Sequence, residues 1–185
     1  MHANMEYSEI YNSLYTSADY DNSECTDNSL KWDVLLRLIS SLEFSTVLDL
    51  GCGRGYYLKK FMELNKNVIG VEFSSVCCNT YLKGIPHVNE DLETFLRKKD
   101  IYDLVICMDV LEHIEPKSLE KVIEGIRAVS KTAIIGVANH VDNIMGHDLH
   151  LITEGCPWWS KILNKFYDSV EEHIFSEKFY IFKCE

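Results

Sequence analysis

The sequence has no excess of basic residues. Its 185 residues include 18 Lys and Arg against 29 Asp and Glu, which gives a net charge of −11 at pH 7. A protein that follows an extended nucleic acid needs clustered Lys and Arg against the phosphates. The composition therefore argues against binding along a nucleic-acid backbone, but it leaves open a local patch that holds an RNA end or loop.

Long apolar runs and paired cysteines are also missing. No run approaches the ~20 apolar residues of a membrane-spanning helix, and no signal peptide opens the chain. The seven cysteines form an odd set without a Cys-x-x-Cys pair, which predicts free thiols in a reducing compartment. We therefore expect a cytoplasmic protein with no membrane contact, in which Cys52 and Cys107 fill apolar space.

A glycine-rich turn follows a short apolar run. Residues 46–58 read Thr-Val-Leu-Asp-Leu-Gly-Cys-Gly-Arg-Gly-Tyr-Tyr-Leu, which predicts a buried strand containing Asp49, then a turn, then a helix start. Glycines let the backbone approach a ligand closely, and a helix start directs N–H groups at it. The spacing is not that of a dinucleotide site, and Asp49 would repel a pyrophosphate but not an ammonium group.

Apolar runs alternate with helical patterns along the rest of the chain, which predicts a largely parallel sheet in one domain. No internal repeat or low-complexity linker interrupts this pattern. The expected strands after the glycine turn are 67–72, 85–89, 102–109, 131–137, 168–175 and 178–183, the last two as a hairpin. The expected helices are 30–39, 74–82, 118–130 and about 158–166, with caps at 27–29 for the first.

The nonapeptide Val-Leu-Asp-Leu-Gly-Cys-Gly-Arg-Gly resembles the first motif of class I S-adenosylmethionine (SAM)-dependent methyltransferases, of the small-molecule type similar to methyltransferase domains 11 and 12. The resemblance covers about residues 30–185. It implies a Rossmann-like three-layer α/β/α sandwich, whose mostly parallel seven-stranded sheet carries an antiparallel C-terminal hairpin strand. It also implies SAM as cofactor and S-adenosylhomocysteine as product.

The resemblance carries cofactor contacts onto particular residues. Glu72 lies about 20 residues beyond the glycine turn, where an acid accepts hydrogen bonds from ribose hydroxyls. Asp91 would contact the adenine amino group, with Leu92 on the ring; a helix cap is the alternative role of Asp91, and Glu90 is the neighbouring candidate. Asp109 would border the reaction centre. The expected cofactor residues are Asp49, Gly51, Cys52, Gly53, Glu72, Phe73, Asp91, Leu92 and Asp109.

Histidines are the candidates for the acceptor side. Transfer to a hydroxyl needs aligned reactants and a group that takes the proton, and imidazole suits that task near neutral pH. The segment 146–152, Gly-His-Asp-Leu-His-Leu-Ile, resembles acceptor-side segments of small O-methyltransferases. We therefore expect His147, His150 and His113 to act there; a hydrogen-bonded loop histidine is the structural alternative.

A metal site is a second interpretation of the same region. Asp109, Glu112 and His113 would share one face of a helical turn, and a later histidine such as His147 would complete a site for Mg²⁺, Mn²⁺ or Zn²⁺. Ubiquinone-pathway O-methyltransferases and small-RNA terminal ribose methyltransferases resemble this pattern, but with Glu at the first position. Because Leu-Glu-His-Ile also occurs in family members without metal, we expect none.

The first 29 residues have an aromatic pattern of their own. Tyr7, Tyr11 and Tyr15 are spaced by four and would share one helix face. The resemblance favours an N-terminal lid or cap segment, 1–29, on a methyltransferase domain, 30–185. A surface helix packed on the core, or a disordered tail, is the alternative.

Missing motifs argue against two other methyltransferase classes. No Asn/Asp-Pro-Pro-Tyr/Phe follows the fourth expected strand, and no Pro-Cys pair stands there, so amino-directed adenine and cytosine C5 enzymes are disfavoured. The expected function is methyl transfer from SAM to a small-molecule acceptor, at oxygen. The alternatives are an RNA end or protein side chain as acceptor, and an inactive SAM-binding partner protein. The oligomeric state has no signal in the sequence.

Overall fold

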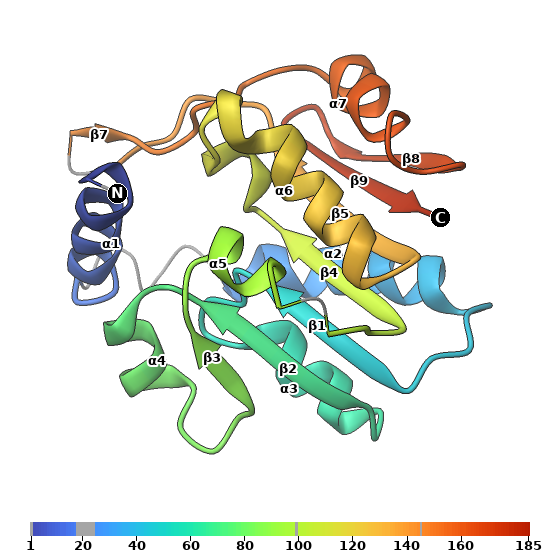
Figure 1. The fold of residues 1–185 in the computed structure, drawn as a ribbon, viewed down its shortest axis with the longest axis horizontal. Coiled ribbons are helices and arrows are strands. Elements are labelled where there is room, and N and C mark those ends of the chain that lie inside the picture. Colours follow the sequence, from blue (N-terminus) through green and yellow to red (C-terminus); the bar gives the residue numbers. More distant parts are fainter. Residues whose placement is uncertain (1, 18–24, 99, 145) are drawn as a thin grey trace.

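The computed structural model describes residues 2–17, 25–98, 100–144 and 146–185. Its centre is a seven-stranded sheet in the order β3-β2-β1-β4-β5-β9-β8 (Figure 1). The strands are β1 (Thr46–Leu50), β2 (Asn67–Glu72), β3 (His87–Asn89), β4 (Leu104–Met108), β5 (Thr132–Ala138), β8 (Val170–Ser176) and β9 (Phe179–Cys184).

The strand directions confirm the predicted Rossmann-like topology. Neighbours from β3 to β5 pair in parallel, with Leu48 of β1 opposite Ile69 of β2 and Val105 of β4. Only the C-terminal hairpin reverses, since β9 runs antiparallel to both β5 and β8. The carboxyl ends of β1, β2 and β4 therefore meet at one edge of the sheet, which is where ligands bind in such folds.

Helices cover both faces and produce the three expected layers. The helices are α1 (His2–Leu14), α2 (Cys25–Ile39), α3 (Tyr56–Glu63), α4 (Ser75–Tyr81), α5 (Leu92–Leu96), α6 (Pro116–Val129) and α7 (Cys156–Leu163). One apolar core joins α5, α6 and α7 to the sheet, and a second joins α2 and α3 to its opposite face. Figure 1 shows α6 in front of the sheet, with α2 and α3 behind it.

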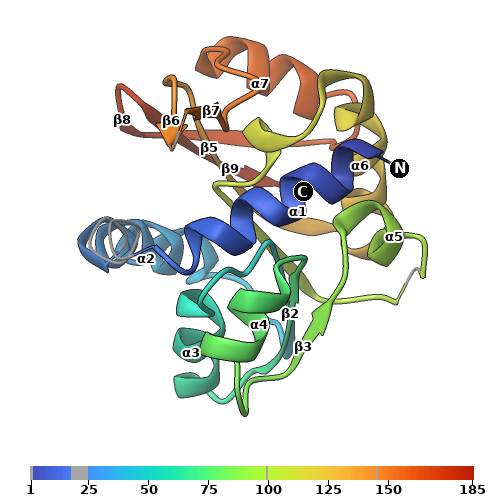
Figure 2. The same cartoon turned by 90° about the vertical axis from the view of Figure 1, so that its left-hand side faces the viewer.

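The first helix belongs to neither layer. Figure 2 looks onto the edge where the parallel strands end, and α1 runs across that edge between α4 and the segment around β7. Its pairwise contacts, described below, join it to the ends of β1, β2 and β4. The segment between β5 and α7, predicted as irregular, contains a small two-stranded sheet of β6 (Asn143–Ile144) and β7 (His147–Asp148).

Some predicted element boundaries were wrong. Helix α2 begins at Cys25, so the residues 27–29 predicted as caps lie inside the helix. The turn after β4 does not start at Asp109; it is a 3₁₀ turn, η1, at Leu111–His113. Sequence signals at the ends of helices are weak, so boundaries predicted from them are uncertain by a few residues.

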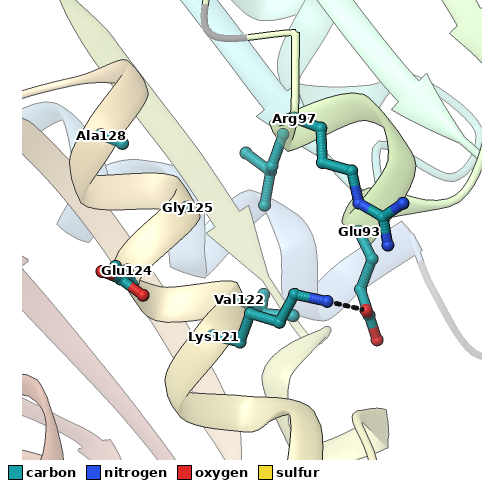
Figure 3. Close-up of a pocket in the computed structure, with 8 residues that line it drawn as sticks. Glu93, Arg97, Lys121, Val122, Glu124, Gly125 and Ala128 are labelled. Atoms are coloured by element: carbon teal, nitrogen blue, oxygen red, sulfur yellow. Dashed lines mark hydrogen bonds and ion pairs between the residues drawn. The ribbon is translucent and has the colours of Figure 1, made fainter.

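A pocket lies between α5 and α6 (Figure 3). Glu93 and Lys121, both in its lining, form an ion pair of 2.9 Å. It is lined by Glu93, Leu96, Arg97, Lys121, Val122, Glu124, Gly125 and Ala128. Because this lining includes none of the predicted site residues, the candidate site is built from the edge of the sheet instead.

Candidate functional site

The glycine turn after β1 is held tightly against its surroundings. The backbone N–H groups of Gly51 and Cys52 both donate to the carbonyl of Val71, at 2.8 and 3.0 Å. Gly51 has a φ of 67°, and a Cβ there would stand 2.5 Å from the Cγ2 of Val110. Glycine is required at this position because both the conformation and the space exclude a side chain.

Two buried acids flank the turn. Asp49 is 1% exposed, and its Oδ2 has no hydrogen-bond partner among the residues that the structure describes. Glu72 is 4% exposed; its carboxylate accepts from the N–H groups of Gly53, at 3.1 Å, and Ser74, at 2.7 Å. Burial, together with the charge of Glu72, holds the pKa of Asp49 well above its usual range. The arrangement fits a ligand that brings hydroxyl donors and a positive charge.

Asp91 follows β3 and caps α5. Its carboxylate accepts from the backbone N–H of Thr94 at 2.9 Å, so the alternative role considered for this residue is present in the structure. Glu90, the neighbouring candidate, pairs with Lys98 at 2.7 Å. Leu92 starts α5 and packs against the core. A cofactor contact of Asp91 or Leu92 stays a prediction.

Asp109 ends β4 in an unusual backbone conformation and pairs with a buried lysine. Its φ is 56°, in the left-handed region. Lys31 of α2 is 5% exposed, and its Nζ lies 2.7 Å from the Oδ2 of Asp109 and 3.7 Å from the ring centre of Phe179. The sequence analysis gave α2 no chemistry and missed Lys31. The sequence did contain a signal for it: Lys31 falls on the same helix face as the buried residues Leu35 and Leu38, where a charged residue is unexpected.

A carboxylate and two imidazoles gather just beyond Asp109. Glu112 is fully buried; its Oε1 accepts from the N–H of Ala138 at 2.5 Å, and its Oε2 has no hydrogen-bond partner within the described part of the chain. The Nδ1 of His113 lies 3.0 Å from the carbonyl of Leu149, and the ring centres of His113 and His150 are 4.7 Å apart. The turn η1 after β4 and the segment after β7 are therefore joined at this point.

Burial decides the charge of the two groups from η1. Burial, then the neighbouring His150, lowers the pKa of His113 to about 3, although its bond to Leu149 acts in the opposite direction. Burial, then the charge of Asp109, raises the pKa of Glu112. His113 is thus neutral at physiological pH and keeps one nitrogen lone pair.

The structure brings together only part of the predicted acceptor and metal groups. Within the described residues, Glu112, His113 and His150 offer ligand atoms that lie within 4.8 Å of one another. His147 is exposed in β7 and does not join this group. Asp109, expected in the alternative metal site, is turned to Lys31.

Helix α1 closes over the same edge with its tyrosine face. The hydroxyl of Tyr11 lies 3.0 Å from the Nδ1 of His113, and its ring stands edge-on to Phe73, with centres 5.1 Å apart. Asn12 accepts from the Oγ of Ser74 at 2.7 Å and from the N–H of Val76 at 3.3 Å. The hydroxyl of Tyr15 lies 3.2 Å from where a Cβ of Gly53 would stand. Figure 2 shows α1 lying across this edge of the sheet.

Two further findings concern the chain as a whole. The six cysteines that the structure describes in full are buried and free, and Cys52 and Cys107 lie in the apolar clusters as expected. A search of the described helices finds none with the length and apolar character that a membrane crossing requires.

The fold and the acid-flanked glycine turn at its carboxyl edge define a Rossmann-like protein of the class I methyltransferase type. The chain belongs to the methyltransferase domain family, whose sequence model matches residues 23–152. The match begins before α2 and ends after His150, so it includes the glycine turn, both buried acids and the carboxylate–imidazole cluster.

Curated relatives match over part of their length. The tRNA U34 carboxymethyltransferase of Pseudoalteromonas translucida (strain TAC 125) is 35% identical over 92 residues, which are 45% of this chain and 28% of that enzyme. The ubiquinone biosynthesis O-methyltransferase of Photorhabdus laumondii subsp. laumondii is 29% identical over 101 residues, 50% of this chain and 42% of that enzyme. The matched part thus spans less than half of each relative.

Solved structures match over nearly the whole chain. The complex of DhpI with SAH has a TM-score of 0.80 at 15% identity and covers 96% of this chain and 94% of that one. The magnesium protoporphyrin IX methyltransferase (ChlM) of Synechocystis PCC 6803, with bound SAM, has a TM-score of 0.68 at 16% identity and covers 96% and 97%. At these identities the likeness shows the fold.

Proposed function

We propose that this chain is a SAM-dependent methyltransferase that transfers a methyl group to an oxygen of a small-molecule acceptor. One observation carries the proposal: two chemically distinct groups of side chains meet at one edge of the sheet. The buried acids Asp49 and Glu72 flank the glycine turn, and the cluster around His113 follows the adjacent strand β4. A cofactor at the first group and an acceptor at the second would lie side by side.

The cofactor half of the site fits SAM by its chemistry. The carboxylate of Glu72 is held at the glycine turn by the N–H groups of Gly53 and Ser74, and an acid at the end of the second strand is the group that accepts from ribose hydroxyls in such folds. The unpartnered Oδ2 of Asp49 suits a cationic part of the cofactor. When bound, SAM supplies a methyl group on a sulfonium, which is a good leaving group. The proposed contacts are Asp49, Gly51, Cys52, Gly53, Glu72, Phe73, Asp91, Leu92 and Asp109.

On the acceptor side, we propose that His113 and His150 contact the hydroxyl that receives the methyl group. His147, exposed on β7, would contact a more distant part of the acceptor. The contribution of these residues is to hold the hydroxyl in line with the methyl group and to accept its hydrogen bond. Asp109 and Lys31 lie between the two halves, since Asp109 follows β4 directly. Their ion pair would hold Asp109 in place at the border of the proposed reaction centre.

Residues 1–29 act as a lid in this proposal, and residues 30–185 form the methyltransferase domain. Helix α1 contacts Phe73 and Ser74 on the cofactor side and His113 on the acceptor side. Asn12 accepts from the hydroxyl of Ser74, whose backbone N–H donates to Glu72, so a cofactor at Glu72 would lie beside the contacts of α1. The lid would therefore open for binding and close before transfer, as lids that exclude water do.

A second candidate acceptor is RNA, favoured by one finding. The name of the relative from Pseudoalteromonas translucida says that it acts on tRNA. The net charge of −11 opposes extended contact with a phosphate backbone, so we rank a small molecule first. A protein acceptor and an inactive SAM-binding partner protein rank below both. The free thiols support a cytoplasmic setting.

Release of S-adenosylhomocysteine from methyl-labelled SAM tests the proposal. A panel of phenols, alcohols, carboxylic acids and amines is offered beside unmodified tRNA, and the label is located in the product. We expect transfer to a small-molecule oxygen, and loss of turnover with retained SAM binding in His150→Ala. Label in tRNA would replace the first candidate by the second. SAM binding without transfer to any acceptor would favour the inactive partner.

A further inference from the structure

We propose that Tyr11 occupies the place of the acceptor in this structure, and that the acceptor is a phenol with one ring that displaces it. The side chain of a tyrosine is itself a phenol, and the hydroxyl of Tyr11 lies 3.0 Å from the Nδ1 of His113. The protein therefore presents one of its own hydroxyls to the acceptor side. The inference rests on the proposed function, because that function places the acceptor at His113.

Two oxygens face the same nitrogen of His113. The hydroxyl of Tyr11 and the carbonyl of Leu149 each lie 3.0 Å from its Nδ1. A carbonyl can only accept a hydrogen bond, whereas a hydroxyl can donate or accept one. A protonated Nδ1 therefore donates to Leu149, and an unprotonated Nδ1 accepts from the hydroxyl. Only the hydroxyl can be exchanged for that of another molecule, because the carbonyl belongs to the backbone of the domain.

Two other rings meet the ring of Tyr11 edge-on. The ring centre of Phe73 lies 5.1 Å away at an interplanar angle of 64°, and that of His113 lies 6.1 Å away at 81°. Phe73 follows β2 and His113 lies in η1, so Tyr11 spans the cofactor side and the acceptor side. Edge-to-face contacts are favourable between flat rings. The space that Tyr11 would leave thus fits a flat ring with a hydroxyl at one end, which is a phenol and not an aliphatic alcohol.

The acids around this space select an uncharged ligand. Burial, and then the charges of Glu112, Glu72 and Asp142, raise the pKa of Tyr11 above its usual range. The same surroundings would disfavour a phenolate or a carboxylate in its place. The acceptor would therefore bind as a neutral phenol, whose proton is available for a hydrogen bond to the Nδ1 of His113.

Helix α1 lies outside the apolar cores, so Tyr11 can leave its place at low cost. None of the three apolar clusters among the described residues includes a residue of α1. Leu14, at its end, is the one buried side chain of this helix within the described part of the chain. Tyr11 can therefore withdraw without opening a core, and the rest of α1 can still cover an occupied site.

Binding of p-cresol, which reproduces the side chain of tyrosine, tests the inference. NMR of the histidine rings follows the titration in protein without SAM, and the ring of His113 should shift. We expect Tyr11→Ala to bind p-cresol at least about tenfold more tightly than the wild type, in which Tyr11 has to be displaced first. Tyr11→Phe keeps a ring in place and should bind it less tightly than Tyr11→Ala. Glu9→Ala, exposed on the same helix, is the control and should bind as the wild type does.

The class of ligand is tested on Tyr11→Ala with two further compounds. The aliphatic alcohol 4-methylcyclohexanol is not flat, and p-hydroxybenzoate carries a negative charge, so both should bind at least about threefold more weakly than p-cresol. Equal binding of 4-methylcyclohexanol or of p-hydroxybenzoate would overturn the assignment of a neutral phenol.

Two results would overturn the inference as a whole: no saturable binding of p-cresol to folded Tyr11→Ala, or equal affinity in this variant and the wild type. Circular dichroism and thermal melting establish that each variant is folded. If Tyr11→Ala is not, hydrogen exchange of the α1 amides in the wild type decides the outcome, since saturating p-cresol should speed it and unchanged exchange would overturn the inference. SAM binding is measured on the same samples. Binding of p-cresol without binding of SAM would refute the proposed function and leave a phenol-binding site, and the reverse would refute the inference alone.

Discussion

Lys31 and Asp109 form an ion pair of 2.7 Å between the second helix and the end of the fourth strand, 78 positions apart in the sequence. The lysine is almost fully buried, whereas the aspartate side chain is 40% exposed. The pair therefore ties the cover of one sheet face to the border of the proposed reaction centre. It also explains why Asp109, which the sequence suggested as a possible metal ligand, is turned toward Lys31 instead.

Separating this pair should destabilise the protein. We expect Lys31→Met to lower the free energy of unfolding by roughly 1–3 kcal/mol, less than for a fully buried pair because Asp109 is partly solvated. In a double-mutant cycle with Asp109→Asn, the two changes should not be additive. Urea unfolding of the four proteins measures the coupling; additive effects would show that the pair contributes nothing beyond its separate side chains.

The stability of the protein should depend on pH through Asp49. Its pKa in the folded state lies above the ordinary value, because of burial and then the charge of Glu72. Folding therefore favours the protonated form, and this contribution is present below the unfolded pKa of about 3.9 and is lost as pH rises through the folded pKa. Asp49→Asn, which carries no charge, should gain stability over the wild type as pH rises above about 4.

Urea unfolding at pH 4, 5.5 and 7 checks this, with the exposed Asp33→Asn as control. The difference between Asp49→Asn and the wild type should grow from pH 4 to pH 7, while the control stays level. A difference independent of pH would mean that Asp49 ionises normally in the folded protein. The same variant should bind SAM more weakly, because the proposed site uses that charge.

Gly51 should tolerate no side chain. Gly51→Ala meets the Cγ2 of Val110 at 2.5 Å and forces an alanine to a φ of 67°, so we expect a loss of roughly 2–4 kcal/mol in the free energy of unfolding. Gly84→Ala has a similar φ of 79° but open space around the new Cβ, and should cost only about 1 kcal/mol.

The second change Val110→Ala makes room and should recover part of the loss in Gly51→Ala. Thermal melting and urea unfolding compare the single and double variants. If Gly51→Ala and Gly84→Ala were equally stable, the contact with Val110 would not be what restricts the turn.

The contacts of α1 should set the rates at which cofactor enters and leaves. Tyr11→Ala removes the contacts with Phe73 and His113, and Asn12→Ala removes the acceptor that holds Ser74. Both variants should bind and release SAM about three- to tenfold faster in stopped-flow fluorescence, because a lid with fewer contacts opens more often. Glu9→Ala, exposed on the same helix, is the control. Unchanged rates in both variants would remove α1 from the path of the cofactor.

The parallel sheet could be predicted from the sequence because its strands are continuous apolar runs, and Glu72 because the glycine turn fixes its register. The side chains that pair with the predicted site residues could not be predicted from the sequence. Lys31 is one lysine beside many apolar neighbours, and its role depends on a strand end far along the chain. The choice between His147 and His150 depends on the path of the segment around β7, which has no periodicity. Only the folded structure brings the ring nitrogens of His113 and His150 close to Glu112.

The most direct measurement is calorimetric titration of SAM into the wild type, Glu72→Gln and the surface variant Glu63→Gln, whose side chain pairs with Lys60. We predict saturable binding of one SAM to the wild type and to Glu63→Gln. Glu72→Gln should bind at least about tenfold more weakly, since hydrogen bonds to a charged group contribute ~1.5–3 kcal/mol. A folded wild type that binds no SAM, or binds it as well as Glu72→Gln does, would contradict the account.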